Sequence, residues 1–308
     1  MSVASPVPVA SLPRAMVWMA GALVSFSAMA LAGRELSSEI SLFQVLFLRN
    51  VICLAVLGML AGRLGWRQLA TRNLRLHVLR NSVHYAASYC WFLGVVAIPL
   101  SEVFAIEFTA PIWTALLAAL FLREPLTRQR VGAIALGFVG ILVILRPGAA
   151  IVHPAAFAVL AAAVGYGSVY VVTKRLTGQD SPFVIVFYMN LVQLMIGVAP
   201  TLWHWVTPSA VLLPWVAVVG ISGLTSHYCI SRAMAHADAT VVAPLDFLRL
   251  PLIAVVGWLL YAEPLNPFVA LGAALVVAGN LVNLFGDRRA RPATAPARPS
   301  KAGRRPWR

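Results

Sequence analysis

The sequence predicts an all-α membrane protein of ten transmembrane helices, arranged as two inverted repeats of five helices each. The chain of 308 residues is 60% hydrophobic and only 11% charged, well below the charge content of a soluble domain. Apolar runs of membrane-spanning length recur along it. The stretch 88–126 also resembles, without gaps, the stretch 227–265. A repeated unit within a membrane chain is typical of transporters.

Ten apolar segments follow one another with short connections. They cover residues 15–33, 41–62, 76–97, 100–122, 128–146, 154–174, 182–204, 211–234, 239–261 and 266–285. The first segment could instead be a cleaved signal peptide, but the repeat requires it as a span. We therefore divide the chain into a cytoplasmic lead (1–14), a first five-helix repeat (15–147), a second five-helix repeat (148–285) and a disordered basic tail (286–308).

The positions of the basic residues predict the orientation. If both termini are cytoplasmic, the outward loops hold only Arg34 and Arg146, and the other span-flanking bases lie inside. Cytoplasmic loops retain Lys and Arg, so we expect a multi-pass protein of the bacterial inner membrane with both termini in the cytoplasm. The net charge of +14 then reflects topology and contact with lipid head groups rather than nucleic-acid binding, since no series of stacking aromatics accompanies it.

Two acids occupy equivalent positions of the repeat, Glu107 in the first copy and Asp246 in the second. A charge inside a membrane must be paired or face a wet cavity. Arg249 lies three residues from Asp246 and could form a structural ion pair with it, while Arg49 could reach Glu107 across the bundle. We expect Asp246 to stay ionised and bind the solute. Glu107 is the candidate coupling site, which exchanges a proton; fixed ion pairs are the alternative.

Three predicted spans carry hydrogen-bonding side chains at helical spacing, which indicates either a lined cavity or contacts between helices. The candidate substrate-binding residues are His84, Tyr85, Tyr89, Tyr166, Tyr170, His227, Tyr228, Arg49 and Asp246. Each histidine stands alone, and the three cysteines form no paired motif, so we predict no metal site and no cofactor. Glycines in segments 128–146 and 266–285 suit close helix packing or a homodimer surface.

The motifs then identify a family resemblance. The chain resembles the EamA-type branch of the drug/metabolite transporter superfamily over residues 15–285. The resemblance rests on Ile98-Pro99-Leu100-Ser101-Glu102, Glu124-Pro125-Leu126, the run from Ala237 to Asp246, and Tyr261-Ala262-Glu263-Pro264. It implies a secondary carrier whose two halves alternate access to a central cavity.

Within that family we expect an inner-membrane exporter of a small polar organic metabolite, with proton coupling as an added hypothesis. The alternative is an importer of a metabolite such as S-adenosylmethionine or riboflavin. The region around His227 and Asp246 resembles the branch of the family that includes carriers of these two metabolites. An intramembrane enzyme is a rival from another class. It would need a catalytic set such as an aspartate cluster, which the sequence lacks. We therefore expect no enzyme activity.

Overall fold

The computed structural model describes residues 11–122, 127–146, 152–176, 179–234, 236–237, 242 and 245–290. Within these ranges every regular element is a helix and there is no strand, which confirms the all-helical class. Most of the predicted lead and tail lie outside the described residues. So do Glu124, Pro125 and Pro244.

Each predicted apolar segment contains a helix. The helices are α1 (Leu12–Leu36), α2 (Leu42–Leu64), the short 3-10 helix η1 (Trp66–Leu69), α3 (Leu74–Ala97), α4 (Leu100–Glu107), α5 (Ala110–Leu122), α6 (Arg128–Leu145), α7 (Pro154–Leu176), α8 (Pro182–Trp203), α9 (Leu213–Met234), α11 (Arg249–Tyr261) and α12 (Pro267–Ala290). In the described part, seven helical segments are long and apolar enough to cross a membrane, the pair α4–α5 counting as one. The chain is therefore a multi-pass membrane protein, while the count of ten spans stays a prediction.

Capping residues explain where several helices begin. The side chains of Ser41, Thr127 and Ser181 accept hydrogen bonds from backbone N–H groups in the first turns of α2, α6 and α8. Such bonds satisfy donors that have no partner within the helix. Proline also stands in the first turn of α1 and of α8, where its missing N–H costs nothing.

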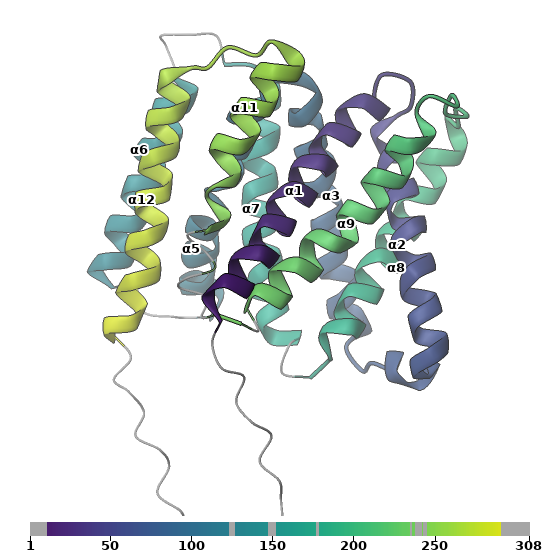
Figure 1. The fold of residues 1–308 in the computed structure, drawn as a ribbon. Helices are drawn as coiled ribbons and strands as arrows, with labels where there is room; N and C mark the ends of the chain where they lie inside the picture. The colour runs from purple at the N-terminus through teal and green to yellow at the C-terminus, as the bar shows by residue number, and fades with distance from the viewer. Residues whose placement is uncertain are drawn as a thin grey trace, which may run out of the picture.

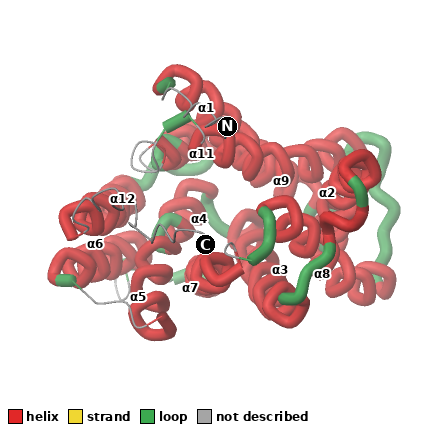
Figure 2. The backbone as a smooth tube through the Cα atoms, turned by 90° about the horizontal axis from the view of Figure 1, so that it is seen from below, coloured by secondary structure: helices red, strands yellow, loops and turns green. Residues whose placement is uncertain are grey.

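The helices pack in pairs that join distant parts of the sequence (Figure 1). α1 packs along α9, α3 along α7, α2 along α8, and α6 along α12. Seen along the bundle, α6 and α12 lie at one end and α2 and α8 at the other, with α4 and α7 between them (Figure 2). The short helix α4 contacts α7, α11 and α12, so its end lies in the interior of the bundle.

Glycines hold α6 and α12 close together within one chain. A Cβ added at Gly140 would lie 2.8 Å from the carbonyl oxygen of Gly272, and one added at Gly272 would lie 2.6 Å from that of Gly140. Backbones therefore meet directly at this crossing. The face of these two glycines is thus used for packing inside the chain rather than for a homodimer.

The predicted span over 100–122 is present, and its helix is broken in the middle. α4 ends at Glu107, a turn follows at Phe108 and Thr109, and α5 begins at Ala110. Pro111 explains the break, because proline has no N–H for the helix and its ring crowds the preceding turn. In the predicted segment 239–261, the described residues Val242, Leu245 and Asp246 are helical, and a turn at Phe247 and Leu248 separates them from α11.

Candidate functional site

Both predicted acids lie where a helix is interrupted. Glu107 is the last residue of α4, and Asp246 precedes the turn that leads into α11. The two breaks are neighbours in space, because the rings of Phe108 and Phe247 pack edge to face with centroids 5.2 Å apart. Interrupted helices free backbone groups and place side chains in the interior of a membrane bundle.

Arg249 joins the two acids. Its Nη2 atom lies 3.4 Å from Oε1 of Glu107 and 3.3 Å from Oδ2 of Asp246. We call these three residues the charged triad. Arg249 is 4% exposed, and its guanidinium lies over aromatic rings, which favour a cation at their faces. These rings are Phe26, Phe104 and Phe108, at 4.3, 5.1 and 4.8 Å from the guanidinium carbon.

Glu107 has a second partner on α3. The indole Nε1 of Trp91 donates to its Oε2 at 2.7 Å, so both carboxylate oxygens of Glu107 are bound. In contrast, Oδ1 of Asp246 is buried and has no hydrogen-bond partner among the described residues, and the same holds for Nε and Nη1 of Arg249. The triad therefore keeps unused hydrogen-bonding capacity on Asp246 and Arg249, but not on Glu107.

Arg49 does not reach Glu107, contrary to the pairing suggested by the sequence. Its Nη2 donates to Oε1 of Gln193 on α8 at 2.9 Å. The side-chain nitrogen of the same Gln193 bonds Nδ1 of His84 on α3. The ring of His84 also contacts that of Tyr166 on α7, with centroids 5.5 Å apart. Four helices thus contribute to a second polar group, which consists of Arg49, Gln193, His84 and Tyr166.

Three more predicted residues lie beside these groups. His227 packs against Phe26, one of the rings that cover Arg249, at 5.8 Å between centroids. Tyr170 is 63% exposed, although its hydroxyl interacts electrostatically with all three residues of the triad. Tyr85 is 5% exposed, and its hydroxyl has no hydrogen-bond partner in the part of the chain that the structure describes.

Two predicted residues contact other aromatics instead. Tyr89 stacks on Phe43 with centroids 4.5 Å apart. Tyr228 meets Trp18 edge to face at 5.7 Å and is 53% exposed. Neither tyrosine contacts the triad through a hydrogen bond or ring packing within the described residues, so their assignment to the substrate site stays a prediction.

A polar cluster closes one end of the bundle. Arg34 of α1 pairs with Glu263 and donates to the carbonyl oxygens of Val95 and Ile98. Glu263 accepts in turn from the backbone N–H of Leu100 at 2.8 Å. The side chain of Glu263 is 11% exposed, although its place at a span end predicts contact with water. This cluster ties the first half of the chain to the end of α11.

A second polar cluster lies at Asp180, in the turn between α7 and α8. Its Oδ2 accepts from Thr71 at 2.9 Å and from Asn73 at 3.2 Å, and it lies 3.0 Å from Nε2 of His77. Burial raises the pKa of Asp180, but these hydrogen bonds lower it by more, so the pKa of this carboxyl lies below its usual value. The cluster fastens the start of α3 to the turn that precedes α8.

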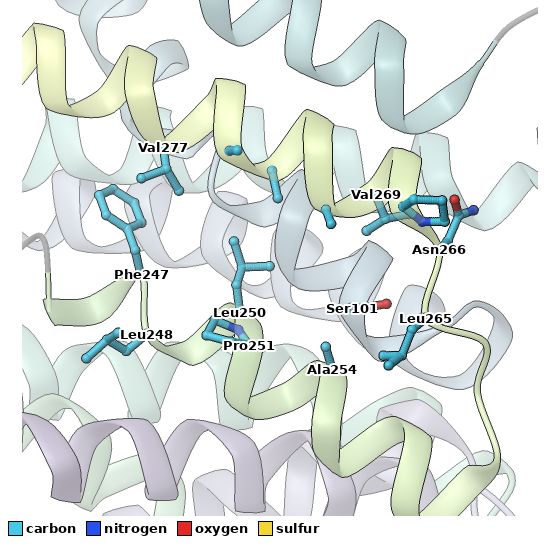
Figure 3. Close-up of a pocket in the computed structure, with 14 residues that line it drawn as sticks. Ser101, Phe247, Leu248, Leu250, Pro251, Ala254, Leu265, Asn266, Val269 and Val277 are labelled. Carbon is cyan, nitrogen blue, oxygen red and sulfur yellow. The ribbon is translucent and has the colours of Figure 1, made fainter.

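A separate cavity of about 520 Å³ lies between α4, α11 and α12 (Figure 3). Its lining is almost wholly apolar, as Phe247, Leu250 and Val277 illustrate, and its polar side chains are Ser101 and Asn266. None of the predicted site residues lines it. An apolar lining leaves the polar groups of a solute without partners, so we do not assign this cavity to a polar solute.

Sequence reasoning missed Trp91, Gln193 and Arg80. Trp91 and Gln193 each lie within an otherwise apolar run and bind a predicted residue. Arg80 counts as a base at the cytoplasmic end of a span in the sequence, yet it is 8% exposed in the structure. A polar or amphipathic residue within an apolar span was the available signal for all three.

Comparisons of this chain with known protein families and sequences find transporters. The profile of the "EamA-like transporter family" matches the chain twice, at residues 13–146 and 153–285. A solved crystal structure aligns with a TM-score of 0.64 at 18% identity, over 92% of this chain and 100% of the other. At that identity the likeness shows the fold alone.

Three curated relatives carry transporter names. A S-adenosylmethionine uptake transporter of Rickettsia bellii is 25% identical, covering 89% of this chain and 94% of the relative. A riboflavin transporter of Brucella anthropi is 30% identical over 79% and 88%. A pseudopaline exporter of Pseudomonas aeruginosa is 24% identical over 82% and 89%. These are names of metabolite transporters and not of enzymes.

Proposed function

Because the chain belongs to the EamA-like transporter family, we propose that it is a secondary carrier of a small polar organic metabolite in the bacterial inner membrane. The observation that carries the proposal is the charged triad. Burying charges in a membrane bundle is costly. Such charges are therefore paired or face a wet cavity, and they mark functional sites. Asp246 and Arg249 have buried atoms without partners in the described ranges, as expected of groups that bind a solute.

The contacts between helices support two inverted halves. α1, the first helix of the first half, packs on α9, the third of the second half. Conversely, α3, the third helix of the first half, packs on α7, the first helix of the second half. Phe108 and Phe247, which occupy equivalent positions of the repeat, touch each other. A pseudo-twofold axis near the triad accounts for all three contacts, and transporters bind solutes at such an axis.

The surroundings of Tyr170 support an interior cavity beside the triad. Its ring is 63% exposed, yet charged residues of α3, α4 and α11 act on its hydroxyl. We infer from this combination that Tyr170 faces a cavity within the bundle rather than lipid. His227, which the structure leaves exposed beside Phe26, fits the same cavity.

The two acids take different roles in this proposal. Asp246 has a free Oδ1 and a cation at hand, so it contacts the solute in its ionised form. Glu107 is held by Arg249 and Trp91 and exchanges the coupling proton when Arg249 moves to the solute. The shared arginine thereby links occupancy of one acid to protonation of the other.

Export is the direction we propose, and import is the second candidate. The named relatives include both directions, since one is called an uptake transporter and another an exporter. The first solutes to test for import are S-adenosylmethionine and riboflavin, because two of the relatives are named for them.

Metabolite profiling tests the proposal. Cells with the gene deleted and cells that express it are compared for untargeted metabolites inside and in the medium. We expect at least one polar metabolite whose ratio of medium to cell content rises with expression. An Asp246→Asn variant at equal membrane abundance should return that ratio to the deletion value. Profiles that do not differ between the expressing and deleted strains would contradict the proposed function.

The proposed topology has its own test. α1 begins and α12 ends at the same end of the bundle (Figure 1), which fits an even number of crossings. A reporter fused after Arg308 should therefore be active on the cytoplasmic side, and one inserted at Pro264 on the periplasmic side. If both reporters indicate the same side, the inverted-repeat topology is wrong.

A further inference from the structure

Three arginines lie buried in the bundle, but the acids of the triad serve only one of them. Arg249 pairs with both Glu107 and Asp246. Arg49 and Arg80 are each 8% exposed. Among the residues that the structure describes, neither forms an ion pair with a carboxylate. Within the described part of the chain, these two buried cations therefore have no carboxylate as a counter-charge.

Neutral groups hold both of these arginines in place. Arg49 donates to the side-chain oxygen of Gln193 at 2.9 Å, and its aliphatic part lies against Gly223 of α9. Arg80 donates from Nε to Oγ1 of Thr173 and from Nη1 to Oδ1 of Asn81, at 2.6 Å in each case. These bonds orient the guanidinium groups but do not neutralise them. An unpaired charge inside a membrane bundle is costly, and such charges mark the path of a substrate or ion.

The two arginines belong to one region of the interior. His84 lies one helical turn from Arg80 on α3 and shares Gln193 with Arg49. Both arginines also act electrostatically on His84 and on His227. His84 thus links the two arginines, since it lies one helical turn from Arg80 and bonds the same Gln193 as Arg49.

An unused donor lies in the same region. Tyr85 of α3 is 5% exposed, and no residue that the structure describes forms a hydrogen bond with its hydroxyl. Arg49 is among the groups that act electrostatically on this hydroxyl. The hydroxyl can donate to a group that Arg49 binds. A buried donor without a partner destabilises the protein, and binding of an acceptor would remove that cost.

We propose that Arg49 and Arg80 form the anion subsite of the carrier and that its solute bears a carboxylate or phosphate group. The proposal rests on the proposed transport function and narrows its substrate class. Guanidinium groups bind carboxylates and phosphates through paired N–H donors. The solute supplies the negative charge that the two arginines lack, and Asp246 of the triad binds any cationic part of the same molecule.

The subsite predicts a separation of stability from transport. Replacing Arg49 or Arg80 with Gln leaves no carboxylate unpaired, and the new amide can still bond the neutral neighbours. Each variant should therefore accumulate in the membrane and unfold at or above the wild-type temperature. Transport of the anionic solute should fall at least tenfold, since a bidentate charged contact is lost. Arg49→Lys keeps the positive charge but loses the paired N–H donors of the guanidinium, so it should retain part of the transport.

The experiment uses a gene-deleted strain that expresses the wild type or one of the variants Arg49→Gln, Arg80→Gln, Arg49→Lys and Arg63→Gln. Arg63 is the matched control, because it lies on the same helix as Arg49 but is exposed at its end. The readout is the set of metabolites whose distribution between cells and medium depends on the wild-type gene. Methyl esterification before mass spectrometry reveals carboxylates in that set, and phosphatase treatment reveals phosphates.

We expect every gene-dependent metabolite to carry one of these groups, and its transport to fall in the two Gln variants but not in Arg63→Gln. Gene-dependent metabolites without an acidic group would overturn the anion subsite while leaving the transport function intact. The anion subsite would also be overturned if the Arg49→Gln variant transported acidic metabolites as fast as the Arg63→Gln control. If no metabolite depends on the gene, the proposed function fails, and the subsite fails with it.

Discussion

Replacing Arg249 with Gln should lower the free energy of unfolding by about 3–5 kcal/mol, the usual cost of removing one partner from a buried ion pair. Arg249 is the cation that the structure gives to both Glu107 and Asp246. Without it two carboxylates face each other in a membrane interior, and the three phenylalanine rings around the guanidinium lose their cation. Thermal unfolding of the purified protein in detergent measures the loss.

A combined variant separates this explanation from a simple packing defect. Adding Glu107→Gln and Asp246→Asn to Arg249→Gln removes all three charges at nearly constant volume. We expect the triple variant to recover most of the lost stability, because neutral amides can hydrogen-bond to one another. A triple variant no more stable than Arg249→Gln would mean that the guanidinium acts through its packing alone. Arg63→Gln serves as the control for removing an arginine.

Glu107→Gln should abolish transport driven by a pH gradient and leave exchange of solute across the membrane. Both oxygens of Glu107 are occupied, one by Arg249 and one by Trp91. A glutamine can keep one such contact, so the solute site should survive. It cannot bind and release a proton, so a gradient has nothing to act on. The test compares vesicles that contain the wild type or Glu107→Gln, with and without an imposed pH difference.

Two outcomes of this test decide the role of Glu107. If gradient-driven transport persists in Glu107→Gln, Glu107 is not the proton site, and the carrier works as a uniporter or exchanger. Loss of exchange together with gradient-driven transport would instead place Glu107 among the residues that bind the solute. Trp91→Phe is a useful companion, because it removes the hydrogen bond to Glu107 and keeps the carboxyl group.

The repeat explains why the two acids could be found from sequence. Glu107 and Asp246 lie at equivalent positions, and the prolines near each of them indicate interrupted helices. Which cation meets which acid could not be found in the same way. The sequence leaves the facing directions of helices open, so it suggests Arg49 rather than Arg249 as the partner of Glu107. In the structure α2 packs along α8, which directs Arg49 to Gln193.

Arg80 shows a second limit of sequence reasoning. It follows the start of α3 by six residues, about 9 Å along the helix. At that depth an arginine can either extend to the membrane surface or remain inside the bundle. Thr173 of α7 and the neighbouring Asn81 decide between these, because they supply oxygens to its guanidinium inside. Asn81 is adjacent in the sequence, but only the contact of α3 with α7 reveals Thr173.

The most direct test of the account is exchange in vesicles that contain only the purified protein and lipid. The vesicles are loaded with the metabolite that profiling identifies, and entry of the labelled compound is followed with no gradient imposed. The account predicts exchange by the wild type. It predicts that Asp246→Asn, although it unfolds at the wild-type temperature, exchanges no faster than protein-free vesicles. Wild-type protein that is folded yet exchanges no faster than protein-free vesicles, or Asp246→Asn that exchanges as fast as the wild type, would contradict it.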